Sequence, residues 1–230
     1  MNTTVSKNTI PVITIDGPSG SGKGTISRKI ASILSWNILD SGAIYRAVAL
    51  CARKNNLQMS DEMNIRRLIK KTTIKFQIDS LYKQKILINR KDASEDIRSE
   101  ECGSNASIIA KYEGVRNDMI HFQRSFLKKP GLIADGRDMG TVVFSDSKIK
   151  IFLTADLEVR AKRRYKELKE KGINVRLAAV LNDMKIRDKQ DKERKHGPLT
   201  MAHDSILVDS TNKSIDIVVS EILKYYENMY

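Results

Sequence analysis

The sequence is poor in cysteine and aromatic residues, and it has no long apolar run. Its 230 residues include two cysteines and one tryptophan, and aromatic residues make up 6% of the chain. Cys51 and Cys102 have no CxxC spacing and no neighbouring histidines, which argues against a disulfide scaffold and a structural zinc site. The longest apolar run, Ala47 to Ala52, is far shorter than the roughly 18 residues of a membrane span. Residues 1–10 lack the apolar core of a secretory signal, so we expect a cytoplasmic protein without membrane contact.

Positive charge is the feature in excess. Lys and Arg number 41 against 28 Asp and Glu, which gives a formal net charge of +13 at pH 7. Such a surplus is typical of proteins that bind nucleic acids, anionic membranes or phosphorylated small molecules. Between Glu158 and Lys195 there are fourteen basic and seven acidic residues, so over half of the net charge lies in one segment. A solvated helical face would explain this segment equally well.

Short apolar strands alternate with helical patterns along the chain, which predicts an α/β fold with a mainly parallel sheet in a single domain, 1–230. Two alternating runs, 74–78 and 85–89, predict a small antiparallel insert. Residues 1–9 are polar and are expected to form a loose tail. The other predicted strands are 11–15, 132–134, 150–154 and 206–208, and the helices lie near 26–34, from 43, 61–69, 100–128, 157–171, 175–195 and 215–226.

A glycine-rich segment connects the first strand to the first helix. Residues 17–23 have the spacing GxxxxGK, in which glycines let consecutive backbone N–H groups point at phosphate oxygens. The following helix adds the positive end of its dipole, and Lys23 supplies a charge to the β and γ phosphates. The predicted ATP-binding residues are Gly17, Pro18, Ser19, Gly20, Ser21, Gly22, Lys23, Gly24 and Thr25.

One position departs from the usual P-loop. The residue after the lysine normally carries a hydroxyl that binds Mg²⁺, but here it is Gly24. The metal ligands therefore stay unassigned, with Thr25 or water as candidates. The form GxxGxGKGT is similar to the loop of nucleoside monophosphate kinases. The Asn-Lys-x-Asp motif that reads guanine is absent, because Asn212-Lys213 is followed by Ser214-Ile215.

Three further polar groups are candidates for binding the second substrate. In segment 40–46, Ser41 and Tyr45 share a helical face beside Arg46, which could hold a phosphate; a helix cap with an exposed arginine is the alternative. Segment 135–138 follows an apolar strand, at the end where parallel sheets bind ligands; a cap on the next helix is the alternative for Asp135. The third group lies on one face of a predicted helix and consists of Arg187, Asp191 and Arg194. Ion pairs within the helix would explain their spacing equally well.

Three long strings carry a resemblance to the bacterial cytidylate kinases: residues 12–25, 39–46 and 131–144. Their order and spacing match from about Pro11 to the C-terminal helix. The resemblance implies a P-loop kinase core whose parallel sheet is flanked by helices, with a small antiparallel monophosphate-binding insert (about 68–105) and a helical lid (about 158–196). It implies transfer of the γ-phosphate of ATP to CMP or dCMP with Mg²⁺, which yields ADP and CDP or dCDP.

The resemblance also implies roles for individual residues. Arg46 and Arg137 would hold the CMP phosphate, and Arg187 would reach the transferring phosphate from the lid. Ser107 and Arg116, which lie in a helical stretch without a pocket signature of its own, would read cytosine with Asp138. The implied catalytic residues are Lys23, Arg137 and Arg187, and the implied CMP-binding residues are Ser41, Tyr45, Arg46, Ser107, Arg116, Arg137, Asp138, Asp191 and Arg194, with Asp191 at the sugar.

Such a reaction needs no general base, because the second pKa of a phosphate monoester is about 6 and the attacking oxygen is already ionised. We therefore expect no catalytic histidine, and we expect ATP, CMP and dCMP as the partners of a monomer that does not bind nucleic acid. Two alternatives stay open: a UMP or shikimate type of kinase, and a basic nucleic-acid-binding P-loop protein. The second is less favoured, because segment 158–195 has a single aromatic residue, Tyr165, for base stacking.

Overall fold

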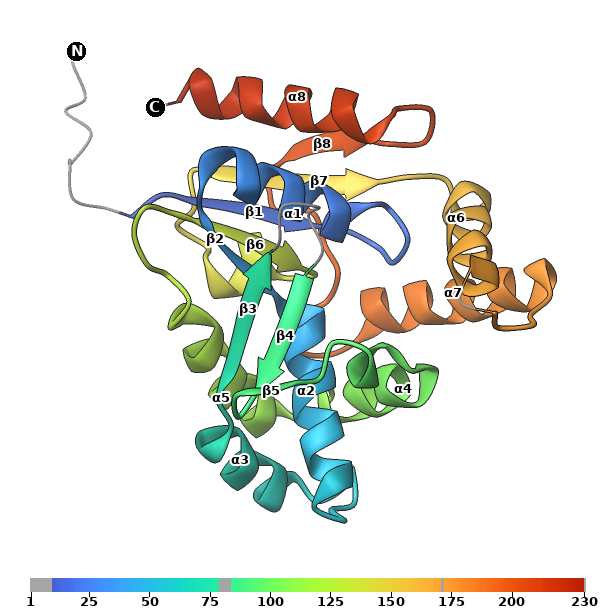
Figure 1. The fold of residues 1–230 in the computed structure, drawn as a ribbon. Helices are drawn as coiled ribbons and strands as arrows, with labels where there is room; N and C mark the ends of the chain where they lie inside the picture. Colours follow the sequence, from blue (N-terminus) through green and yellow to red (C-terminus); the bar gives the residue numbers. More distant parts are fainter. Residues whose placement is uncertain (1–9, 79–83, 171, 230) are drawn as a thin grey trace.

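The computed structural model describes residues 10–78, 84–170 and 172–229 (Figure 1). A five-stranded parallel sheet in the order β2-β6-β1-β7-β8 lies at its centre. The predicted α/β fold with a parallel sheet is confirmed. The strands are β1 (Val12–Asp16), β2 (Asn37–Asp40), β6 (Leu132–Gly136), β7 (Ile149–Thr154) and β8 (Ile206–Asp209).

Helices cover both faces of this sheet and enclose two hydrophobic cores. Because side chains alternate along a strand, Ile13 and Ile15 of β1 face one core while Val12 faces the other. The first core lies under α1 (Lys23–Leu34) and α8 (Ile215–Glu227). The second lies under α2 (Ser41–Lys54), α3 (Glu62–Lys71) and α5 (Glu113–Arg124).

The helix starts show how local chemistry sets the element boundaries. The Asp40 carboxylate accepts a hydrogen bond from the Ala43 backbone N–H at 2.9 Å, so α2 begins at Ser41 and not near Ala43 as predicted. Within the predicted helix 26–34, Ile26 and Ile30 are buried in the core beneath α1, whereas Ile33 is 50% exposed.

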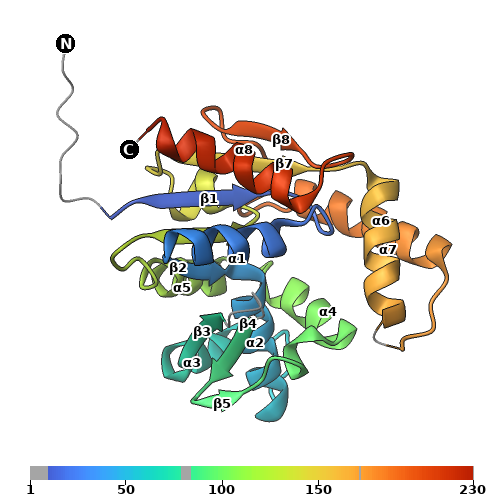
Figure 2. The same ribbon diagram turned by 45° about the horizontal axis from the view of Figure 1, so that its top comes forward.

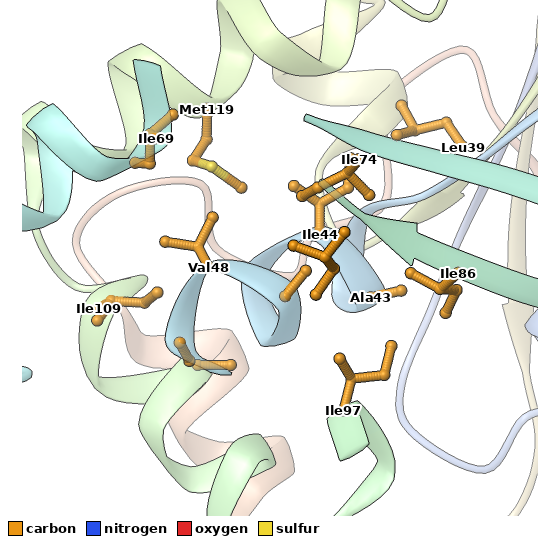
Figure 3. Close-up of a cluster of buried hydrophobic side chains, with 14 of the residues drawn as sticks. Leu39, Ala43, Ile44, Val48, Ile69, Ile74, Ile86, Ile97, Ile109 and Met119 are labelled. Atoms are coloured by element: carbon orange, nitrogen blue, oxygen red, sulfur yellow. The ribbon is translucent and has the colours of Figure 1, made fainter. Parts of the chain in front are cut away.

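The antiparallel pairing predicted for residues 74–78 and 85–89 is confirmed, and the tip between them falls partly outside the described residues. β3 (Ile74–Ile78), β4 (Gln84–Ile88) and β5 (Lys91–Asp92) form a separate three-stranded sheet. A short 3₁₀ turn, η1 (Asp96–Arg98), and α4 (Glu100–Ile109) follow. Figure 3 shows Ile86 of β4 and Ile97 of η1 beside Ala43 and Ile44 of α2, so the insert shares the second core.

The basic segment forms a helical hairpin at the carboxyl edge of the sheet, where the arrowheads of β1 and β7 point (Figures 1 and 2). Its helices are α6 (Leu157–Glu170) and α7 (Leu177–Glu193), which is shorter at both ends than predicted. The predicted last residue of the first of these helices, Lys171, is not among the described residues. Within the described ranges no helix combines the length and the apolar character that a membrane span requires.

Candidate active site

A cleft of about 870 Å³ lies at the carboxyl edge of the parallel sheet, between the P-loop, the insert and the helical hairpin. Polar residues that are far apart in the sequence meet there. Two of the predicted residues, Gly17 and Pro18, do not line the cleft. The predicted residues that do line it are Ser19 to Thr25, Ser41, Tyr45, Arg46, Ser107, Arg116, Arg137, Asp138, Arg187, Asp191 and Arg194.

The P-loop connects β1 to α1, packs closely against β7 and contains hydrogen bonds between its own residues. Gly17 has a φ of 152°, and a Cβ atom there would collide with the carbonyl oxygen of Leu153 on β7. Only glycine fits this close approach. The Pro18 carbonyl accepts hydrogen bonds from Lys23 Nζ at 2.7 Å and from Ser21 Oγ at 3.0 Å. Lys23 therefore folds back over the loop.

Buried charges surround Lys23. Burial, together with the Arg137 charge, lowers the pKa of its ammonium group to about 7, although Asp135 and Asp16 oppose this shift. Burial in turn raises the pKa of Asp135, which Lys23 counteracts. The two carboxylate oxygens of Asp16 accept hydrogen bonds from the Met139 and Gly140 N–H groups at 2.9 and 2.8 Å. Asp16 thus orders the turn after β6, while Asp135 lines the cleft.

An ion pair joins the end of β6 to the helical hairpin. Arg137 Nε donates to Asp191 Oδ2 on α7 at 2.7 Å, and both side chains are largely buried. Arg194 lies between two carboxylates, 3.9 Å from Asp191 and 4.0 Å from Asp138. The strong partner of Asp191 is thus on another element. Intrahelical pairing alone does not explain this group of residues.

A second ion pair lies deeper in the cleft. Arg116 of α5 donates to Asp138, and each side chain is no more than 7% exposed. A Cβ atom at Gly197 would collide with both partners, so the backbone after α7 closes directly over the pair. Burial also raises the pKa of the neighbouring Tyr45 phenol to about 12, which keeps its proton in place. This part of the cleft is a tight polar pocket.

Three more of the predicted residues, Arg46, Ser107 and Ser41, line the cleft and form hydrogen bonds with other protein groups. Arg46 Nη1 donates to the carbonyls of Ile97 and Ser99 at 3.1 and 3.3 Å, where the insert meets α2. Ser107 Oγ donates to a carbonyl of its own helix, α4. Ser41 Oγ accepts from Gln123 Nε2 at 2.9 Å. Each of these groups keeps hydrogen-bonding capacity for a ligand, because a guanidinium has five N–H donors and a hydroxyl can both donate and accept.

The cleft also contains cations that sequence reasoning did not assign to it. Apart from two neighbouring arginines on α6, they come from separate parts of the chain, and an isolated Lys or Arg has no local pattern that marks it. The position of Asp135 at the end of its strand indicates either a site residue or a helix cap, and the structure places it in the cleft lining. The unassigned cations that line the cleft are Arg28, Arg98, Lys111, Arg163, Arg164 and Lys213.

Comparison with known proteins assigns the family. The family model described as cytidylate kinase matches residues 13–228. The chain belongs to the cytidylate kinase family. The cytidylate kinase of Nitrosomonas europaea is 45% identical over 222 residues, which cover 96% of this chain and 97% of that protein. The cytidylate kinase of Methylococcus capsulatus is 47% identical, with 96% and 99% covered.

The family assignment covers the insert and the helical hairpin as well as the P-loop, because the cytidylate kinases are matched along nearly their whole length. The resemblance seen in the three sequence strings is therefore confirmed. A solved structure of an uncharacterized protein from Eubacterium ventriosum has a TM-score of 0.50 at 18% identity, with 95% and 99% of the chains covered. That likeness concerns the fold alone.

Proposed function

We propose that this member of the cytidylate kinase family transfers the γ-phosphate of ATP to CMP or dCMP, in pyrimidine nucleotide metabolism. The products are ADP and CDP or dCDP. The observation that carries the proposal is the meeting, in one cleft, of the P-loop with two arginine–aspartate pairs, Arg137–Asp191 and Arg116–Asp138. The P-loop can bind the phosphates of ATP, and the two arginine–aspartate pairs can bind a second phosphate ester that carries a base.

ATP takes the P-loop side of the cleft. The backbone N–H groups of residues 19–25 and the start of α1 hold its phosphates, and Lys23 exchanges the Pro18 carbonyl for a phosphate oxygen. The exchange is favourable because burial destabilises the charged ammonium, as its lowered pKa indicates, and the negative phosphate compensates that charge.

The binding of ATP is expected to take up a proton at pH 8. With a pKa of about 7, Lys23 is mostly neutral there in the free protein, and the triphosphate charge restores its proton. Because binding and protonation are linked, ATP affinity should fall as the pH rises from 7 to 9. Titration calorimetry without Mg²⁺, in two buffers of different ionisation enthalpy, measures the uptake.

Lys23→Arg is the matched control for this titration, since its guanidinium stays charged over the whole range. The variant should bind ATP without proton uptake. If the uptake stays at the wild-type value, another group is the one that titrates.

The acceptor needs charge neutralisation more than base catalysis. A CMP phosphate oxygen is already ionised at neutral pH, so the barrier is repulsion between two polyanions. Arg46 and Arg137 hold the acceptor phosphate in this scheme, and Arg187 on α7 stabilises the charge of the group in transfer. The helical hairpin covers both substrates and keeps out water that would hydrolyse ATP.

Cytosine is read by Asp138 with Arg116 and Ser107. Cytosine presents an amino donor at N4, where uracil presents an O4 acceptor. A carboxylate accepts a hydrogen bond from the N4 amino group and repels the O4 oxygen, so the buried Asp138 favours CMP over UMP. Asp191 contacts the sugar, and Ser41, Tyr45 and Arg194 complete the wall of the site.

The residues present fit a magnesium ion that ATP brings with it. Mg²⁺ prefers oxygen ligands and keeps several waters, and the carboxylate of Asp135 and the hydroxyl of Thr25 both line the cleft beside the P-loop. Among the described residues, no cluster of three His, Cys, Asp or Glu side chains forms an all-protein metal site. Asp135 and Thr25 would therefore hold the ion through bound water while the ATP phosphates supply its other ligands. The ion would neutralise phosphate charge.

The deciding experiment measures ADP release with ATP and, in turn, CMP, dCMP, UMP, AMP, GMP and shikimate. We expect the highest kcat/KM with a cytidine monophosphate. Faster turnover of any other acceptor would reject the assignment in favour of a related small-molecule kinase. Tight salt-dependent DNA or RNA binding without turnover would support a nucleic-acid protein instead. That the chain acts as a cytoplasmic monomer without a nucleic-acid partner stays a prediction.

A further inference from the structure

Arg160 is a buried cation that the reaction as described does not use. It lies in the first turn of α6 and is 5% exposed. Its Nε donates to the Ala155 carbonyl at 2.8 Å, its Nη1 to the Ser19 carbonyl at 3.1 Å, and its Nη2 to Asp188 Oδ2 at 2.7 Å. One side chain therefore joins the strand end before α6, the P-loop and α7.

Tight packing surrounds this junction. Gly20 of the P-loop has a φ of 76°, and a Cβ atom there would lie 3.0 Å from Met184 Cε and 3.1 Å from Arg160 Cβ. Met184 belongs to the small core between α6 and α7. The phosphate loop thus rests directly on both helices of the hairpin, and the Arg160–Asp188 pair lies at that contact.

Stability alone is a weak explanation for this pair. Buried ion pairs often contribute no more stability than apolar side chains of the same size. Asp188 Oδ1 is also buried, with no hydrogen-bond partner among the residues that the structure describes, and such a group costs free energy. The geometry points to a role in placing α7.

We propose that Arg160 and Asp188 are positioning residues that set the register of α7 over the P-loop. Asp188 is adjacent to Arg187 and one helical turn before Asp191. Its attachment to Arg160, which also binds the Ser19 carbonyl, therefore fixes where these two residues meet the substrates. A shift of about 1 Å at such a site lowers a rate by about 100-fold. The inference rests on the proposed kinase reaction.

The deciding variant is Asp188→Asn, which keeps the volume of the side chain and weakens the ion pair. We expect kcat for CMP phosphorylation to fall about 10- to 100-fold, with KM values for ATP and CMP within about threefold of wild type. Hydrolysis of ATP without CMP should rise relative to transfer, because a displaced α7 admits water. Arg160→Met should behave alike, and the double variant should be no worse than either single one.

Lys166→Ala provides the matched control on α6. Lys166 pairs with Glu170 at 4.0 Å on the surface, so its loss should change neither kcat nor the hydrolysis ratio. An unchanged kcat in Asp188→Asn, a change in KM alone, or a variant that fails to fold would each overturn the positioning role. Failure of the proposed function is a separate result, since wild type itself would then not phosphorylate CMP.

Discussion

Replacing Lys23 by methionine is expected to lower kcat for CMP phosphorylation by about 10²- to 10³-fold while the fold stays intact. The lysine supplies the charge at the centre of the phosphate cradle, and loss of one such electrostatic contact typically costs this much. The fold should survive because the ammonium is buried at a cost, and Asp135 beside it can take up a proton when the cation is removed.

Steady-state kinetics and thermal unfolding test this expectation together. Lys29→Met is the control on the same helix, because Lys29 lies at the surface, paired with Asp216, and is absent from the cleft lining. The control should keep wild-type activity. A Lys23→Met protein with near-normal turnover would remove the P-loop from the proposed mechanism.

Replacing Asp138 by asparagine is expected to reverse much of the preference for CMP over UMP. The amide can accept from cytosine N4 but can also donate to uracil O4, whereas the carboxylate can only accept. One such base contact is worth about 1–3 kcal/mol, so the ratio of kcat/KM values should change by about 5- to 150-fold. KM for ATP should stay near that of the wild type.

The choice of asparagine follows from the burial of the Arg116–Asp138 pair. Asp138→Ala would leave the Arg116 charge buried without its partner, which costs about 3–5 kcal/mol, and loss of folding would then obscure selectivity. Competition assays with CMP and UMP provide the readout. Asp204→Asn, at an exposed carboxylate that pairs with Lys150 outside the cleft, is the control. Unchanged selectivity in Asp138→Asn would refute the role of this residue in reading the base.

The P-loop was predictable because its structure depends on contacts within a few residues. The Pro18 carbonyl is five residues from Lys23, and the glycines allow the backbone turn between them. The same holds for the three residues on one face of α7, since helix geometry alone places Arg187, Asp191 and Arg194 together. What the spacing left open was whether these groups pair within the helix or face a ligand.

Arg116 and Ser107 could be assigned only from the resemblance to a family. Arg116 meets Asp138 across two elements, α5 and the end of β6, and its own helix shows an ordinary amphipathic pattern. Arg160 was not singled out at all. In the sequence it is one of fourteen basic residues in a charged segment, and only burial distinguishes it from the solvated ones.

The sequence by itself determined the α/β alternation, the P-loop and the family, because these depend on residue type, period and spacing along the chain. The tertiary structure decided which of the many cations meet the substrates. A salt bridge or a lowered pKa depends on distance and burial in three dimensions, and those are set only when the sheet aligns its strand ends and the helical hairpin packs over them. The net charge of +13 thus indicated phosphate, and the packing selects the residues that bind it.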